Sequence, residues 1–127
     1  MERFKLWLNR YADAWRVGDP DAIVELFAPE ALYQDSPFSE PLRGREAIRA
    51  YWAQGARHSK RDVEYAAEAL AADADTGLGL AHWHAEFTSA PVEHRVELDG
   101  ILMAAIGEDG RCTSFREWWH RLESHDD

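Results

Sequence analysis

The first part of the chain spaces its hydrophobic residues as a helix does. Between residues 4 and 15 an apolar side chain recurs at intervals of three or four, which predicts one buried helical face ending near Gly18. This face consists of Phe4, Trp7, Leu8, Tyr11 and Trp15. A short second helix is expected to begin at Asp19-Pro20, and its apolar stripe is Ile23, Val24, Leu26 and Phe27.

Prolines divide the segment that follows. Pro29 makes it costly to continue the second helix, and residues 31–35 suit a short strand. Pro37 and Pro41 prevent a regular element, so we expect a loop around them. Helical spacing then resumes and predicts a helix over residues 45–58.

Alternation of polar and apolar residues predicts that the rest of the chain forms strands. Residues 78–88 alternate cleanly. Residues 62–71 also alternate; their alanines suit a helix too, but Val63 and Tyr65 favour a strand. Two further strands are expected over residues 93–106 and 112–121, joined by a hairpin turn at Glu108-Asp109-Gly110.

This order of elements, helices first and antiparallel strands afterwards, is typical of an α+β fold. A chain of 127 residues can bury one modest core, so we expect a single domain over residues 1–127. A curved sheet wrapped by the helices would leave a cavity that is open at one end.

Composition narrows the classes of function. The net charge of −10 argues against a nucleic-acid partner or an anionic membrane surface. The chain has no apolar run of about 18 residues, the length that a membrane span needs. The lone Cys112 cannot form an intramolecular disulfide, and residues 1–10 lack the apolar core of a signal peptide, so we expect a cytoplasmic protein. The six tryptophans suit a large-residue core and an aromatic ligand pocket equally well.

Three motifs resemble the nuclear transport factor 2-like superfamily. They are GD-x-DAIV-x-LF-A at residues 18–28, P-x-x-EP-x-x-G-x-x-AI at residues 37–48, and GRCTSFREWW at residues 110–119. The likeness is to its SnoaL-like branch, which includes ketosteroid isomerases, polyketide cyclases and limonene epoxide hydrolases. It implies a cystatin-like fold, in which a cone-shaped, curved antiparallel sheet is wrapped by N-terminal helices. These proteins share a pocket rather than one reaction.

The resemblance points first to Asp35 and Tyr11. In ketosteroid isomerases a tyrosine of the first helix donates a hydrogen bond to the substrate oxygen, and the general-base aspartate follows at the same interval, here 35 − 11 = 24. A carboxylate in an apolar pocket has a raised pKa, which suits a base near neutral pH. Two plainer readings remain open: Asp35 can bond its own turn, and Tyr11 can pack in the core.

Two further acids come from the same resemblance. The second, protonated aspartate of the isomerases falls at Leu102, so a true ketosteroid isomerase is not expected. The two acids of the limonene epoxide hydrolases correspond to Glu117 and Asp99, but their arginine corresponds to Glu97, so epoxide hydrolysis is not predicted either. The comparison with the isomerases turns Leu102 toward the cavity, whereas the comparison with the epoxide hydrolases turns Asp99 toward it. A bulge at Gly100 would allow both.

Strand alternation extends the candidate site. If Glu117 faces the cavity, its neighbours at positions 115 and 119 do so too, and positions 118 and 120 face outward. The residues expected to line a ligand pocket are Trp15, Phe27, Tyr33, Trp52, Trp83, Leu102, Phe115 and Trp119.

The outward side chains form a second candidate surface, made of His82, His84, Trp118 and His120. Three histidines can bind zinc, but no tight ligand spacing supports a metal site here. No metal and no cofactor is therefore predicted. An exposed patch of this kind generally needs a partner, and in this superfamily the same face commonly forms a dimer, so we expect a homodimer.

The sequence leaves two hypotheses of function. The first is a cofactor-independent isomerase, cyclase or dehydratase that uses Asp35, alone or with Glu117, as acid and base on a small apolar or partly polar organic compound, while Tyr11 polarises an oxygen. The second is a non-catalytic ligand-binding or dimeric assembly module of the same fold. In the second case Asp35 would be solvated or tied to its loop, and a bound ligand would be recovered unchanged.

Overall fold

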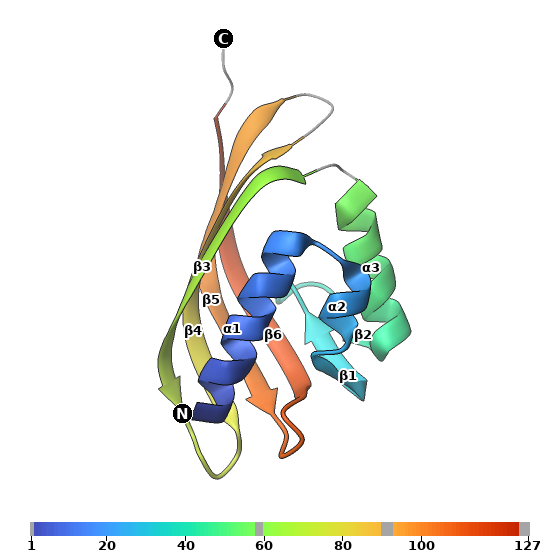
Figure 1. The fold of residues 1–127 in the computed structure, drawn as a ribbon, viewed down its shortest axis with the longest axis vertical. Coiled ribbons are helices and arrows are strands. Elements are labelled where there is room, and N and C mark those ends of the chain that lie inside the picture. Colours follow the sequence, from blue (N-terminus) through green and yellow to red (C-terminus); the bar gives the residue numbers. More distant parts are fainter. Residues whose placement is uncertain (1, 58–59, 90–92, 125–127) are drawn as a thin grey trace.

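The computed structural model describes residues 2–57, 60–89 and 93–124 (Figure 1). Its helices are α1 (Glu2–Val17), α2 (Pro20–Val24) and α3 (Arg45–Arg57). Its strands are β1 (Phe27–Gln34), β2 (Leu42–Arg43), β3 (Lys60–Ala72), β4 (Leu78–Ser89), β5 (His94–Ile106) and β6 (Cys112–Ser124). Residue 58, where we expected the third helix to end, lies outside the described residues.

The six strands form one curved sheet in the order β2-β1-β6-β5-β4-β3. Strands β3 to β6 form an antiparallel meander, and β1 pairs parallel with β6. All three helices lie on one side of this sheet, here called the inner face (Figure 1). The arrangement confirms the α+β class and the curved sheet that the order of the elements predicts. None of the helices in the described part of the chain has the length and apolar character needed to cross a membrane.

Helix α1 packs on the sheet through the face that its periodicity predicts. Phe4, Trp7, Leu8, Tyr11 and Trp15 are all buried. The Trp7 indole N–H also donates a hydrogen bond of 3.0 Å to a backbone carbonyl between α2 and β1. The guanidinium of Arg16, near the end of α1, donates to the backbone carbonyl of a β3 residue at 2.7 Å. Both halves of the helix are therefore tied to other elements.

The second helix is shorter than its apolar stripe predicts. It ends at Val24, and Phe27 begins β1 instead of continuing the helix. The carbonyl of Leu26 accepts the backbone N–H of Cys112 at 2.8 Å, because this stretch runs alongside β6. Pro29 falls where the pairing of β1 with β6 shifts register, so its missing N–H interrupts no regular ladder. The two-residue strand β2 was not predicted.

Strand β5 passes through Gly100 without a bulge, so Leu102 and Asp99 do not both face inward, as a bulge would have allowed. Its pairing with β4 and with β6 is continuous on both sides of this residue. Regular alternation turns Leu102 to the inner face, where it is fully buried, and leaves Asp99 exposed on the outer face. The glycine is needed for a different reason: a Cβ at position 100 would lie 2.0 Å from the carbonyl oxygen of Trp118 on β6.

Gly100→Ala should therefore destabilise the fold, because backbone atoms of β5 and β6 would have to separate to admit the methyl group. We expect a loss of about 1–3 kcal/mol in the free energy of unfolding, measured by urea denaturation. Gly107→Ala is the matched control, since the nearest atom to its Cβ is a side-chain oxygen of Asp109 at 3.2 Å. Equal urea midpoints for the two variants would contradict this account of Gly100.

Candidate functional site

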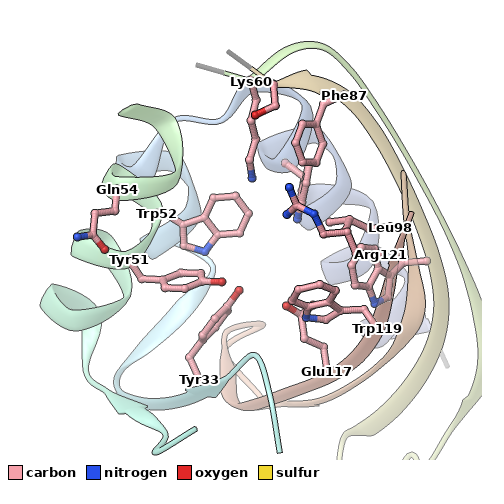
Figure 2. A pocket seen from close by; sticks show the side chains of 13 residues that line it. Tyr33, Tyr51, Trp52, Gln54, Lys60, Phe87, Leu98, Glu117, Trp119 and Arg121 are labelled. Carbon is pink, nitrogen blue, oxygen red and sulfur yellow. The ribbon is translucent and has the colours of Figure 1, made fainter. Parts of the chain in front are cut away.

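The inner face of the sheet and the helices enclose a cavity of about 470 Å³. This volume lies within the range of small-molecule sites. Helices α1 and α3 and strand β1 supply one side of the cavity, and strands β3 to β6 of the sheet supply the other (Figure 2). The lining residues are Trp15, Tyr33, Tyr51, Trp52, Gln54, Lys60, Trp83, Phe87, Ser89, Leu98, Glu117, Trp119 and Arg121.

Contacts between rings hold the aromatic walls in place. Trp15 stacks on Tyr65 with ring centroids 5.0 Å apart, and Tyr65 stacks in turn on Trp83 at 5.9 Å. Trp15 also meets the edge of Trp52 at 5.8 Å. Each ring is thus supported by another, which restricts its rotamers and keeps the apolar wall formed without a ligand.

Glu117 is the only buried charged side chain among the described residues, with 8% of its surface exposed. It lies on β6 directly across from Leu102 of β5, and both side chains are buried at the inner face. Burial, and secondly the negative charge of Asp35, raise the pKa of Glu117 to about 8, while the positive charge of Lys60 opposes the shift. Glu117 is therefore a neutral acid at pH 7 and can donate a proton into the cavity.

Asp35 meets the cavity through two of its lining residues. The hydroxyl of Tyr51 donates a hydrogen bond of 2.5 Å to Oδ2 of Asp35. The indole N–H of Trp119 donates one of 2.9 Å to the backbone carbonyl of Asp35. Burial, followed by the contact with Asp35, raises the pKa of Tyr51, so this tyrosine stays a neutral donor and orients the carboxylate.

Polar atoms from α3 and β1 converge on the cavity. Figure 2 shows the hydroxyls of Tyr33 and Tyr51 and the indole nitrogen of Trp52 pointing into it, with Glu117 on the opposite side. The indole N–H groups of Trp52 and Trp83 are buried and have no hydrogen-bond partner in the described part of the chain. Because an unpaired buried donor is unfavourable, a ligand oxygen or a water molecule is expected to accept from them.

The predicted pocket residues fall into two groups. Trp15, Tyr33, Trp52, Trp83, Trp119 and Glu117 line the cavity. Phe27, Leu102, Phe115 and Tyr11 are fully buried in the core around it. Phe115 supports Tyr33 by stacking at 4.8 Å, and Tyr11 stacks on Trp7 at 5.0 Å. The Tyr11 hydroxyl is buried, with no hydrogen-bond partner among the residues described.

Asp99 lies on the outer face of the sheet and does not line the cavity. Its carboxylate is 3.0 Å from a ring nitrogen of His82 and 3.0 Å from one of His84. These contacts lower the pKa of Asp99, that with His84 most strongly. We therefore leave Asp99 out of the acid–base site.

A group of possible metal ligands occurs on the same outer face, but it is not the three histidines considered from the sequence. Ligand atoms of His84, Glu86 and Glu97 lie within 4.8 Å of one another. Arg95 already approaches Glu86 at 3.5 Å, and His84 contacts Glu86 at 3.2 Å. Because these groups balance one another's charge, we assign no metal to them.

Sequence reasoning missed several lining residues. Phe87 lies on the same strand face as Trp83, and Arg121 on the same face as Glu117, so alternation could have found both. No local pattern marks Tyr51 or Lys60, because their places depend on how α3 and the start of β3 pack against the sheet.

Comparison with known proteins identifies the family. Residues 8–115 match the model of the SnoaL-like domain, so the chain belongs to this family within the nuclear transport factor 2-like superfamily. It is 31% identical over 119 residues to a steroid Δ-isomerase of Nocardioides simplex, covering 91% of this chain and 88% of the relative. It is 29% identical over 117 residues to the epoxide hydrolase LasB of Streptomyces lasalocidi, covering 90% of this chain and 40% of LasB.

A solved structure agrees with the fold. The chain is similar to SalBIII, an epoxide hydrolase/cyclase-like enzyme with a role in pyran ring formation in the polyether salinomycin. The two superpose with a TM-score of 0.80 at 26% sequence identity, over 94% of this chain and 91% of SalBIII. The cone-shaped architecture expected from the sequence is thereby confirmed.

Proposed function

We propose that the protein is a cofactor-independent acid–base enzyme of the isomerase, cyclase or dehydratase type. Its substrate is a small organic compound with an apolar body and a reacting oxygen. The observation that carries the proposal is Glu117, a protonated acid in an aromatic cavity, electrostatically coupled to the carboxylate of Asp35. Such a pair can give one proton and take another without a metal or an organic cofactor.

Each acid has a separate role in this proposal. Glu117 donates its proton to a substrate oxygen, which is a carbonyl, an ether oxygen of a strained ring or a departing hydroxyl. Asp35 does not line the cavity, so it takes the proton that the substrate loses, from carbon or from an attacking hydroxyl, through Tyr51. The Tyr51 oxygen accepts the substrate's proton as the Tyr51 hydroxyl passes its own proton to Asp35. The hydroxyl of Tyr33 and the N–H of Trp52 stabilise negative charge on the oxygen. The proton returns from Asp35 to Glu117 before the next turnover.

The position of Glu117 supports an isomerase-like use of the pocket. The isomerase pattern places its protonated second acid at residue 102, which is leucine here. Glu117 is the residue paired with Leu102 across the β5–β6 ladder, and both are buried at the inner face. A carboxyl group is therefore supplied to nearly the same place by the neighbouring strand.

Two probes test the proposal directly. A β,γ-unsaturated ketosteroid would report isomerisation by the absorbance of the conjugated product, and a hydroxy-epoxide would report ring closure by NMR. We expect turnover of at least one probe above the buffer rate, falling as the pH rises through about 8, where Glu117 loses its proton. A ¹³C NMR titration of Glu117 with a midpoint near the ordinary glutamate value would overturn the role of this residue as acid.

The alternative is a pocket that binds without catalysis. It is favoured by one observation: Asp35 is bonded to Tyr51 and does not itself line the cavity. In that case a compound bound in the cavity would be recovered unchanged, and substituting Asp35 or Glu117 would alter affinity alone.

We also propose a homodimer formed through the outer face, as expected from the sequence. This face carries the His82–Asp99–His84 network beside partly exposed apolar side chains, among them Ile101 and Leu80. Arg116 lies over the ring of Trp118, which keeps this large side chain on the same surface. A mixed apolar and polar surface of this kind suits pairing with an identical copy. A cytoplasmic location stays a prediction from the lone cysteine.

Ile101→Arg should turn the dimer into a monomer without changing the cavity, because it places an unpaired charge in the apolar part of the interface. Light scattering coupled to size-exclusion chromatography would measure the mass. Leu6→Arg is the control, since Leu6 is an exposed leucine on α1, on the other side of the molecule. A wild-type protein that is monomeric at all concentrations would contradict the proposed dimer.

A further inference from the structure

Two basic side chains gather at one end of the cavity. Figure 2 shows the nitrogen atoms of Lys60 and Arg121 directed into it on the side of Phe87, away from Tyr33. The ammonium nitrogen of Lys60 is 4.7 Å from the ring centroid of Trp15 and 4.8 Å from that of Phe87. Ring faces thus hold this cation in place.

The charge of this basic end is only partly balanced. No ion pair involves Lys60 among the residues that the structure describes, although the chain has a net charge of −10. Arg121 contacts Glu123 through its Nε atom. Partial burial lowers the pKa of Lys60, and the charge of Arg121 lowers it further. An anion between the two groups would relieve this repulsion.

Glu117 does not provide that anion at neutral pH. It lines the same cavity, but its pKa of about 8 leaves it protonated, so Lys60 and Arg121 outnumber the ionised groups of the lining. The cavity is therefore divided into a cationic end and an end with hydroxyls and a neutral acid, with aromatic walls between them.

We infer that the natural ligand carries a carboxylate, which binds between Lys60 and Arg121 while its apolar body lies along Trp15 and Trp83. This orientation would present the far end of the molecule to Glu117, Tyr33 and Tyr51. The inference rests on the proposed function, because it takes the cavity as the substrate site. It adds the charge class of the substrate and its orientation in the cavity, and it makes Lys60 a binding residue.

A matched pair of probes tests the charge preference without any turnover. We would measure the binding of 2-naphthoic acid and 2-naphthamide by isothermal titration calorimetry at pH 7 in 50 mM salt. The two differ in charge but hardly in shape. We expect the acid to bind at least about 10-fold more tightly than the amide, with an advantage that shrinks at high salt.

The same calorimetric titrations on variants show which residues cause the preference for the acid over the amide. Lys60→Met should reduce the advantage of the acid to less than about 3-fold, and Arg121→Met should weaken it in the same direction. Lys5→Met is the matched control: Lys5 is the other lysine of the chain and is exposed on α1, so this variant should keep the full advantage. Circular dichroism would confirm that each variant is folded.

Three results would overturn the inference. They are equal affinity of the wild-type protein for acid and amide, an undiminished preference in both Lys60→Met and Arg121→Met, and the failure of both compounds to bind. Equal affinity would leave the acid–base proposal standing, because that proposal is judged by turnover and by the titration of Glu117. If the turnover and titration experiments reject the acid–base proposal but the acid still binds more tightly than the amide, the protein has a carboxylate-binding pocket without the proposed catalysis.

Discussion

Glu117→Gln should remove most of the catalytic activity and at the same time make the fold more stable. Glutamine has nearly the shape of the protonated glutamate but cannot donate a proton to the substrate. A general acid typically contributes about 100- to 10,000-fold, so we expect kcat/KM to fall by that order. The measurement is turnover of whichever probe the wild-type protein accepts. Unchanged turnover in this variant would reject Glu117 as the acid.

The gain in stability has a definite dependence on pH. The pKa of Glu117 is raised from an ordinary 4.5 to about 8 in the folded protein. Between these values the folded state retains a proton that the unfolded state releases, so the stability of the wild type falls as the pH rises from about 4.5 to 8. The penalty is about 3 kcal/mol at pH 7 and approaches about 5 kcal/mol above pH 8. Glutamine carries no such penalty.

Urea denaturation of both proteins at pH 5, 7 and 9 would measure this difference. The two should be within about 1 kcal/mol of each other at pH 5 and separate progressively above it. Glu68→Gln serves as the control, because Glu68 is an exposed glutamate of β3 and its substitution should not alter the pH dependence. Parallel curves for wild type and Glu117→Gln would show that Glu117 is not held protonated.

Asp35→Asn should have the second large effect. If the carboxylate of Asp35 takes the substrate proton, the amide of asparagine cannot do so in its place. We therefore expect kcat to fall by about 100- to 10,000-fold. The substitution has a further consequence that a purely structural role would not produce. Because the negative charge of Asp35 helps to raise the pKa of Glu117, the NMR titration of Glu117 should shift to lower pH in this variant.

Asp99→Asn provides the control for Asp35. It makes the same chemical change at a residue of β5 that lies on the outer face, so both the turnover and the titration of Glu117 should stay as in the wild type. Full activity in Asp35→Asn would reject its role as base. Loss of activity in Asp99→Asn would show that the outer face takes part in the reaction.

These two predictions separate the enzyme from the binding module. In an enzyme of the proposed type, both substitutions lower turnover far more than they change the affinity for a bound compound. In a binding module there is no turnover to lower, and ligand affinity is the only functional property that they can alter. The coupling between the two carboxyls is a property of the unliganded protein, and it can therefore be measured before a substrate is known.

The sequence alone determined most of the elements and the buried face of α1 and β6. The spacing of Trp7, Tyr11 and Trp15 gave the buried side of α1, and alternation along β6 turned Glu117 and Trp119 inward. These inferences hold because the periods of 3.6 and 2 residues are properties of the backbone within one element. The motifs around Asp35 further gave the fold, which the comparisons confirm.

Only the tertiary structure decided how those elements meet. It set the regular path of β5 through Gly100, the end of α2 at Val24 and the hydrogen bond from Tyr51 to Asp35. It also brought Lys60 over the ring of Trp15 and enclosed Glu117 deeply enough to keep it protonated. Periodicity assigns a side chain to a face but carries no information about what another element places opposite it. Burial, charge coupling and the shape of a cavity all depend on those opposing groups.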